Sequence, residues 1–410
     1  MPEIFKVKTF ANGLTLLGLE LPSVESAAFS FVIKSGSAFD PTDKIGSAAI
    51  ANEWLMRGAS GKSSKELNES LDSIGSQHNL GCSAMHIQFS SAQLGRNLPQ
   101  ALKILADIFL RPNLDEKTFA PCKELIMQDL ALLEDEPSRK CTMILRENFF
   151  PAPYGHSRFG TVESLSEITA DSLAGHIKSQ FSPNKAILAV AGNFDWQKIS
   201  DLVSDLFADW TGEQITPPAP VETKHAEHFI YKDTAQTQIG IMHTAASAKS
   251  DLYYPARIAE AVLSRGMGSR LFTEVREKKA LCYGISSQYL SVADSAGMLT
   301  YAGTRPELAQ QTLDVTIEEL VKLEAGITED ELARAKTQIR SMMIMQGQST
   351  SARAGALVSD WYTLGRLRSL EELNQAIQDV TCEDVKNYLQ QYPAENFALV
   401  TIGPKALKLS

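Results

Sequence analysis

Three residues near the N-terminus stand at a spacing that is used in catalytic helices. Gly46 and Gly58 enclose a short run, and within it Ala49, Asn52 and Glu53 fall at positions i, i+3 and i+4. Residues with this spacing lie on one face of an α-helix. A helix that holds a catalytic zinc ion can carry two histidines and a general-base glutamate at these positions. The segment therefore has the spacing of a zinc-binding helix, but other residues occupy it.

The composition is that of a globular protein, and it excludes several classes. The 410 residues are 44% hydrophobic and 21% charged, and the formal net charge is −10. This charge argues against nucleic-acid binding, which requires a dense patch of lysine and arginine. The five cysteines are scattered and form no C-x-x-C pair, so neither a disulfide framework nor a thiolate zinc site is predicted.

The N-terminus and the hydropathy pattern predict a cytoplasmic protein. Residues 1–8 lack the apolar core of a signal peptide. No apolar run of the sequence reaches the roughly 18 residues that a membrane-spanning helix needs. We therefore expect no membrane partner and no nucleic-acid partner.

The hydrophobic pattern predicts strands that alternate with helices. The pair Asn12-Gly13 between apolar alternations predicts a β-hairpin. The remaining expected elements are strands at 27–34, 85–94 and 186–191 and helices at 64–74, 98–110 and 116–133.

On the long helix at 116–133, one carboxylate interrupts an apolar stripe. Asp129 falls among the stripe residues Phe119, Cys122, Ile126 and Leu133. Such an inconsistency can mark a functional site, or the acid can simply pair with a neighbouring lysine or arginine. We expect Pro137 to end this helix.

The second half of the chain repeats the first at a nearly constant offset. Three pairs of segments match in the same order: 113–120 with 326–333, 168–171 with 380–383, and 186–192 with 397–403. Their offsets are 326 − 113 = 213, 380 − 168 = 212 and 397 − 186 = 211. The repetition indicates an internal duplication into two domains of the α+β class.

A proline-rich linker separates the two copies. Residues 211–225 contain Gly212, Pro217, Pro218 and Pro220. We therefore expect an N-terminal domain at 1–210 and a homologous C-terminal domain at 226–410.

Together, these features resemble the insulinase/pitrilysin superfamily of inverted-motif zinc peptidases. The sequence is most similar to its short-chain bacterial members and to the subunits of the mitochondrial processing peptidase. The family's segment reads G-x-x-H-x-x-E-H-x-x-x-x-G after a strand and Gly-Ser, and here Ser35-Gly36-Ser37 precedes Gly46. The resemblance implies two homologous domains of the metalloenzyme LuxS/peptidase-like type, each a mostly antiparallel sheet with helices packed on one face.

The resemblance also assigns the positions of the metal site. The two histidine ligands fall on Ala49 and Glu53, the general base falls on Asn52, and the third ligand falls on Asp129, which lies 129 − 53 = 76 residues beyond Glu53. Catalytic zinc requires three protein ligands in which nitrogen or sulfur is well represented. Alanine has no donor and asparagine does not accept a proton near neutral pH, so we expect no zinc in this chain. A hard cation held by the two carboxylates is the less favoured alternative, and the seven histidines are expected to lie on the surface or in the core.

The family's second functional segment is better preserved. Residues 266–283 resemble its G-x-x-S-R-L-F-x-x-V-R-E-x-x-x-L-x-Y pattern. In active members, the residues at the positions of Arg276 and Tyr283 hold the substrate backbone and stabilise the tetrahedral intermediate. A guanidinium and a phenol can both donate to an oxygen that gains negative charge. Without the resemblance, Arg276 would be interpreted as a solvated helix residue and Tyr283 as the start of a half-buried strand.

Two further positions carry weaker expectations. Arg270 is expected to have a structural role. The strand at 81–89 corresponds to the edge strand on which the family lays its peptide substrate as an added strand.

The resemblance implies a non-catalytic subunit of a heterodimeric zinc peptidase. Arg276 and Tyr283 would act in the zinc site of a homologous partner subunit, and the chain alone would be inactive on peptide substrates. The alternative is a catalytically inactive structural or peptide-binding protein similar to the core subunits of the cytochrome bc1 complex. An autonomous peptidase with an unusual metal arrangement is the least favoured interpretation.

Overall fold

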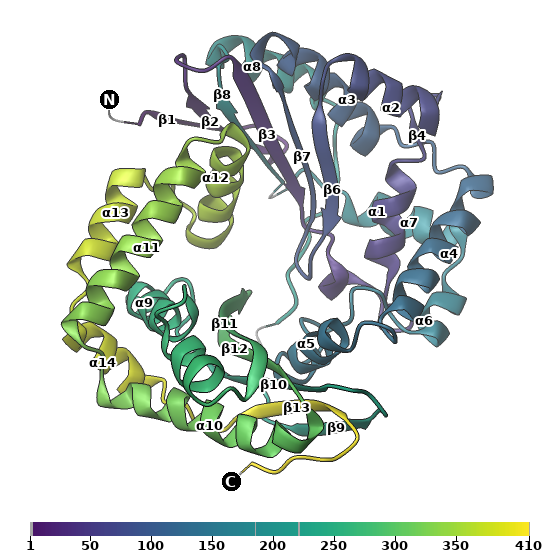
Figure 1. The fold of residues 1–410 in the computed structure, drawn as a ribbon. Coiled ribbons are helices and arrows are strands. Elements are labelled where there is room, and N and C mark those ends of the chain that lie inside the picture. Colours follow the sequence, from purple (N-terminus) through teal and green to yellow (C-terminus); the bar gives the residue numbers. More distant parts are fainter. Residues whose placement is uncertain (1–2, 185, 220–221, 410) are drawn as a thin grey trace. The chain divides into compact units, whose positions relative to one another are not determined.

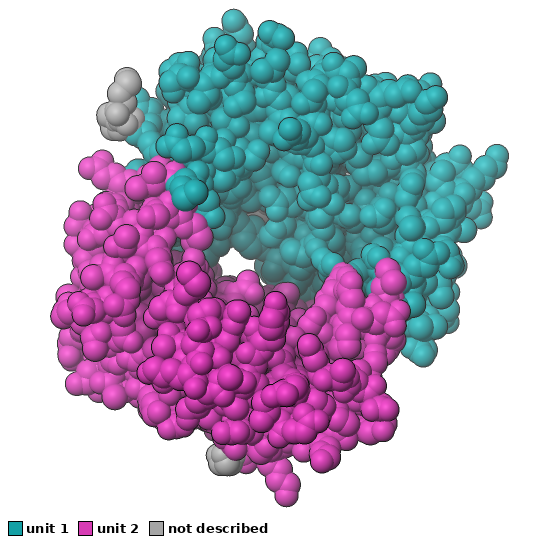
Figure 2. All heavy atoms as spheres, viewed as in Figure 1, with its two compact units in different colours: residues 1–131, 156–218, 345–369 teal, residues 132–155, 219–344, 370–410 magenta. Residues whose placement is uncertain are grey.

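The computed structural model describes residues 3–184, 186–219 and 222–409. The chain divides into two compact units, which Figure 2 distinguishes by colour. Unit 1 comprises Met1–Ala131, His156–Pro218 and Met345–Ser369, and unit 2 comprises Leu132–Gly155, Ala219–Ile344 and Leu370–Ser410. Each unit is an α+β structure around one large sheet, so the predicted fold class is confirmed.

The described part of unit 1 contains a six-stranded sheet in the order β1-β2-β8-β3-β7-β6 (Figure 1). Its strands are β1 (Phe5–Thr9), β2 (Thr15–Glu20), β3 (Ser26–Ile33), β6 (Gln77–Cys82), β7 (Ile87–Leu94) and β8 (Ile187–Gly192). The predicted hairpin joins β1 and β2, and Gly13 at its turn has a φ of 95°, which a residue without a side chain adopts at low cost.

The described part of unit 2 contains a five-stranded sheet in the order β11-β12-β10-β13-β9. Its strands are β9 (Glu227–Tyr231), β10 (Thr237–Thr244), β11 (Cys282–Val292), β12 (Ser295–Thr304) and β13 (Ala398–Gly403). In each sheet, the strand that comes last in the sequence, β8 or β13, lies between one parallel and one antiparallel neighbour. This shared topology supports the internal duplication.

The helices follow the same repeat. Those of unit 1 are α1 (Ser47–Leu55), α2 (Ser64–Ser73), α3 (Leu98–Leu110), α4 (Glu116–Leu132), α6 (Val162–Glu167), α7 (Ala170–Gln180), α8 (Trp196–Leu206) and α12 (Thr350–Leu364). Those of unit 2 are α5 (Pro137–Phe149), α9 (Tyr253–Ser264), α10 (Ala309–Lys322), α11 (Glu329–Gly347), α13 (Leu370–Asp379) and α14 (Cys382–Gln391). The predicted match of 168–171 with 380–383 begins equivalent helices, because Thr169 forms a capping box at the start of α7 and Thr381 forms one at the start of α14.

Each unit contains one helix that comes from the opposite half of the sequence and packs on the sheet of that unit. Helix α5 comes from the N-terminal half but packs against β10 and β13. It approaches closely because Gly240 of β10 has no side chain, and the Cys141 Sγ donates to the Val400 carbonyl at 3.4 Å. Helix α12 comes from the C-terminal half and packs against β3 and β8, where Leu357 and Val358 join the core of unit 1.

The face of the unit 1 sheet that is opposite to α12 packs against helix α3. Alternate residues of a strand point to opposite faces. Val32 of β3 belongs to the core beneath α12, and its neighbour Phe31 contacts the ring of Phe109 from α3 at 4.8 Å. The sheet is therefore buried on both sides, which explains the continuous burial of β2 and β3.

The helix exchange has two consequences for the sequence-based expectations. The compact units are not continuous ranges, since the expected domains at 1–210 and 226–410 each give one helix to the other unit. Pro137 does not end the long helix as we expected, because α4 ends at Leu132 and Pro137 begins α5. A proline suits the first turn of a helix, where its missing N–H has no helical acceptor to lose.

The predicted linker at 211–225 contains the boundary between Pro218 and Ala219. Residues 220–221 of this linker lie outside the described residues. Within the described ranges, no helix combines the length and the apolar character that crossing a bilayer requires.

Candidate functional site

The N-terminus of α1 is fixed by a buried carboxylate. Gly46 precedes the helix with a φ of 102°, and Asp40 accepts hydrogen bonds from the backbone N–H groups of Gly46 at 2.8 Å and Ala48 at 2.9 Å. Burial raises the pKa of Asp40 to about 7, although these hydrogen bonds act in the opposite direction. The Nε2 of His176 lies 4.0 Å from Asp40 Oδ1, but burial lowers the pKa of His176, which disfavours its charged form.

The three residues of the helical frame are all on α1, as predicted. Ala49 is buried at 7% exposure and offers no donor atom. The Asn52 side chain donates to the carbonyl of Leu80 on β6 at 3.4 Å, and its Oδ1 is buried without a partner among the described residues. Glu53 is half-exposed and forms an ion pair with Arg57 at 3.5 Å. Asn52 and Glu53 are thus engaged in local contacts with the chain itself.

Asp129 lies on α4, half-buried, and the predicted stripe residues Phe119, Cys122 and Ile126 are buried beside it. Helix α4 is held against α1 by the Trp54 indole, which donates to the carbonyl of Asp115 at 3.2 Å and to the hydroxyl of Thr118 at 3.0 Å. In the part of the chain that the structure describes, Asp129 makes no hydrogen bond or ion pair with residues of α1.

These residues do not fit a catalytic zinc ion. Of the four predicted positions, Ala49 has no ligand atom, and Asn52 has only an amide whose nitrogen bonds to Leu80. The remaining donors are the carboxylates of Glu53 and Asp129, which lack the nitrogen or sulfur ligands that such zinc sites favour. Across residues 3–184, 186–219 and 222–409, no group of three or more His, Cys, Asp or Glu side chains is arranged to hold a metal ion.

The second predicted segment begins with a rigid turn in unit 2. Arg270 forms a bidentate pair with Glu331 of α11, at 2.7 Å to Oε1 and 2.9 Å to Oε2, and it also donates to the carbonyl of Gly326 at 3.0 Å. This pair holds the pKa of Glu331 down, at about 2. The geometry agrees with the expected structural role of Arg270.

Arg276 and Tyr283 lie side by side in the structure. The Arg276 guanidinium carbon is 5.5 Å from the centroid of the Tyr283 ring and 4.6 Å from that of Phe272. Tyr283 is 84% exposed, which is unusual for so large an aromatic side chain. Arg276 forms no ion pair with any described residue, so its in-plane N–H groups remain available to a ligand.

Three departures from regular backbone geometry surround this pair. Phe272–Lys278 form a π-helix, which carries Arg276. Ala280 has a φ of 49°, in a region that residues with side chains rarely adopt. The pairing of β11 with β12 then shifts between Cys282 and Gly284, so that Tyr283 is the extra residue of a β-bulge. π-Helical turns, positive φ values and bulges are enriched at functional sites, where they redirect side chains.

The sequence did not predict these irregularities. Only the pattern of 266–283 pointed to this region, since a π-helix and a bulge have no periodicity that a short segment reveals. The predicted edge strand at 81–89 has the wrong bounds: the strand at this edge of the sheet is β6 (Gln77–Cys82), and the predicted range spans the turn into β7.

Family models match most of the chain. The model described as insulinase (peptidase family M16) matches residues 18–162, and the model described as peptidase M16 inactive domain matches residues 167–339. The chain belongs to the insulinase/pitrilysin superfamily. This identification confirms the predicted resemblance.

Relatives within this superfamily extend over the whole chain. An uncharacterized zinc protease of Bacillus subtilis is 27% identical over 408 residues, covering 98% of both chains. An uncharacterized zinc protease of Rickettsia felis is 25% identical over 414 residues and covers 100% of both.

Solved structures share the fold of this chain. A structure described as a peptidase M16 inactive domain from Pseudomonas fluorescens has a TM-score of 0.91 at 20% identity and covers 99% of both chains. A protease from Helicobacter pylori has a TM-score of 0.88 at 20% identity and covers 100% of both. The two-domain peptidase-like fold is therefore confirmed.

Proposed function

We propose that this chain is the zinc-lacking subunit of a heterodimeric zinc peptidase and supplies Arg276 and Tyr283 to the active site of a homologous partner. The observation that carries the proposal is a contrast between two segments of one chain. The positions for metal binding and proton transfer hold Ala49 and Asn52, whereas the Arg276–Tyr283 pair is intact and built on specialised backbone, with Arg276 half-buried and Tyr283 exposed.

The pair is suited to holding a peptide carbonyl. The rings of Phe272 and Tyr283 lie close to the Arg276 guanidinium, whose N–H donors lie in its own plane. An oxygen that gains negative charge during peptide hydrolysis would accept from these donors and from the Tyr283 hydroxyl. Removing one such donor typically lowers kcat by about 10²–10³-fold.

The partner would carry the features that this chain lacks. We expect it to have an intact H-x-x-E-H segment and to bind the zinc ion, which supplies the hydrolytic chemistry. The substrate would be a peptide that both subunits contact.

Reconstitution with such a partner tests the proposal. The H-x-x-E-H homologue from the same genome would be co-expressed with this chain, and cleavage of a fluorogenic peptide library would be measured. We expect activity only when both chains are present, and Arg276→Ala and Tyr283→Phe should each lower kcat at least tenfold without disrupting assembly.

Two substitutions provide matched controls. Arg334→Ala removes an exposed arginine of α11, and Tyr231→Phe removes a hydroxyl from a 70% exposed tyrosine on β9, at the opposite edge of the same sheet. Both should leave kcat unchanged. If Arg276→Ala behaves like Arg334→Ala, or if the chain forms a stable assembly without any peptidase partner, the structural or peptide-binding alternative replaces the proposal.

A further inference from the structure

A groove in unit 1 is lined by none of the predicted site residues. It lies between the C-terminal ends of α3 and α8 and one side of α7, and its volume is about 740 Å³. This volume falls within the roughly 300–1,000 Å³ that is typical of sites for small ligands. All of its lining residues belong to unit 1.

The floor of the groove is aromatic and apolar. Phe109 and Phe181 contact each other with ring centroids 5.8 Å apart, and Ile177 and Trp210 also line the groove. The polar atom of Trp210 is already bonded, because its indole Nε1 donates to the Phe181 carbonyl at 3.1 Å. The floor therefore presents mainly carbon to a ligand, and it would accept an apolar side chain.

The rim carries charges of both signs. Arg111 and Lys178 contribute the cations, from the end of α3 and from α7, whereas Asp205 and Asp209 contribute carboxylates from the end of α8 and the turn after it. Within the described ranges, none of these cations forms an ion pair with Asp205 or Asp209. Opposite charges that line one groove without pairing across it can complement a ligand with two charged ends.

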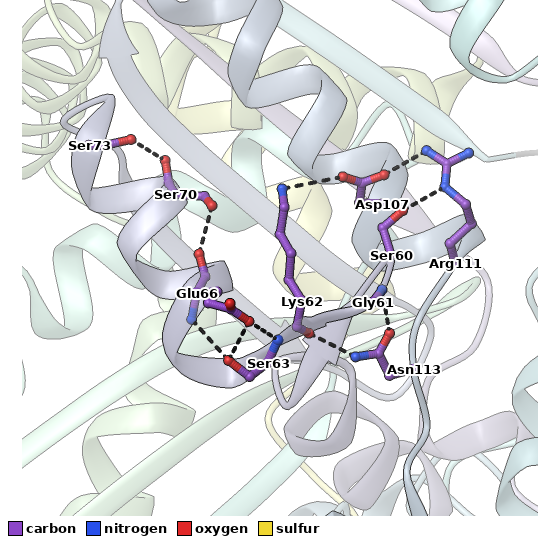
Figure 3. Close-up of polar contacts among 10 residues, drawn as sticks. All are labelled: Ser60, Gly61, Lys62, Ser63, Glu66, Ser70, Ser73, Asp107, Arg111 and Asn113. Carbon is purple, nitrogen blue, oxygen red and sulfur yellow. Dashed lines mark hydrogen bonds and ion pairs between the residues drawn. The ribbon is translucent and has the colours of Figure 1, made fainter.

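The Arg111 guanidinium is held in place from outside the groove. Asp107 accepts from its Nη2 at 2.6 Å, and Ser60 accepts from its Nε at 3.1 Å (Figure 3). The Nζ of Lys62 also forms an ion pair with Asp107, at 3.9 Å from its Oδ2. This network fixes the direction of Arg111 before any ligand binds, which lowers the entropic cost of binding.

We infer that this groove binds a short peptide with free ends and an apolar side chain. Its carboxylate would pair with Lys178 and Arg111, its ammonium group would pair with Asp205 and Asp209, and its side chain would enter the aromatic floor. An extended tripeptide spans roughly 10 Å between its charged ends. A nucleotide would meet the two carboxylates, and a neutral hydrocarbon would offer no partner to Lys178, Asp205 or Asp209.

The inference does not depend on the roles of Arg276 and Tyr283. It concerns a binding site on the isolated chain, so its test needs neither a partner subunit nor peptidase activity.

Calorimetric titration of the full chain with the tripeptide Leu-Phe-Leu tests the inference. We expect the free tripeptide to bind, and the same tripeptide with an acetylated N-terminus and an amidated C-terminus to bind at least tenfold more weakly. Lys178→Gln and Asp209→Asn should each weaken binding at least fivefold, because each removes one of the paired charges. Ala174→Trp should abolish binding, because it fills the groove from α7 without altering the rim charges.

Two control variants and a check of folding complete the test. Asp171→Asn and Lys198→Gln change exposed charges on α7 and α8 that do not line the groove, and both should leave the affinity unchanged. Circular dichroism would verify that each variant is folded. The inference is wrong if the tripeptide shows no binding at millimolar concentration, if the blocked peptide binds equally well, or if folded Ala174→Trp retains the affinity.

Discussion

Replacing Asp40 with asparagine should reduce the pH dependence of the stability of unit 1. In the native protein this carboxyl is buried at 7% exposure and accepts two backbone N–H bonds at the start of α1. Burial raises its pKa from 3.8 to about 7. The native state therefore keeps a proton on Asp40 at pH values where the unfolded chain has released it.

The sign and size of the effect follow from proton linkage. Between about pH 4 and pH 7 the native state binds one proton more at Asp40 than the unfolded state does, so the free energy of unfolding falls as the pH rises. Each pH unit contributes about 1.4 kcal/mol. Over roughly three units the loss approaches about 4 kcal/mol, which is a large part of the stability of a typical domain.

The tryptophans provide an assay that is specific to unit 1. All four, Trp54, Trp196, Trp210 and Trp361, lie within that unit. Urea unfolding followed by tryptophan fluorescence at pH 4, 5, 6 and 7 would give the free energy of unfolding for the wild type and for Asp40→Asn. Asp43→Asn removes an exposed carboxylate three residues away and serves as the control.

The result turns on a competition between burial and hydrogen bonding. If burial dominates, the wild type should lose stability relative to Asp40→Asn as the pH rises, and Asp43→Asn should follow the wild type. Parallel curves for Asp40→Asn and the wild type would refute the reasoning. They would show that the N–H groups of Gly46 and Ala48 keep the carboxylate ionised in the native state.

Three further outcomes are expected. Glu331→Gln should lower the free energy of unfolding by about 1–3 kcal/mol at pH 7, since it breaks a half-buried pair with Arg270. Because that pair lowers the pKa of Glu331 from 4.5 to about 2, the difference from wild type, followed by circular dichroism, should shrink as the pH falls through this range. Leu145→Ala should cost about 2–5 kcal/mol, since Leu145 is fully buried on α5, and hydrogen exchange should increase at β10 and β13 rather than at β3 and β8. Metal analysis of the purified chain should find well under one equivalent of zinc, and one tightly bound equivalent would show that residues of this chain do hold zinc.

The regular elements were predictable because they follow from local patterns. Helix α3 at Leu98–Leu110 has the predicted bounds. Its buried residues recur with the period of a helix, so the sequence pattern shows the element. The duplication was visible because both copies keep the same helix-starting residues, Thr169 and Thr381. The exchange of α5 and α12 left no such signal, since the choice of sheet depends on contacts between residues far apart in the sequence.

The candidate site was predictable in residue identity but not in geometry. The spacing of Ala49, Asn52 and Glu53 placed them on one helix, and α1 confirms this placement. The bond from Asn52 to Leu80 could not be foreseen, because it depends on how α1 meets β6. The stacking of Arg276 on Tyr283 likewise depends on a π-helix and a bulge, which arise from tertiary packing.

The exchanged helices also bear on the origin of the chain. Each sheet is completed by a helix encoded in the opposite half, so neither half alone contains every element of a unit. A single-copy ancestor with this connectivity would have exposed the sheet surface that α5 or α12 now covers. Two such molecules could have covered each other by exchanging that helix, which is the arrangement of a domain-swapped homodimer. Fusion of the two genes would then have converted an intermolecular exchange into the intramolecular one observed here.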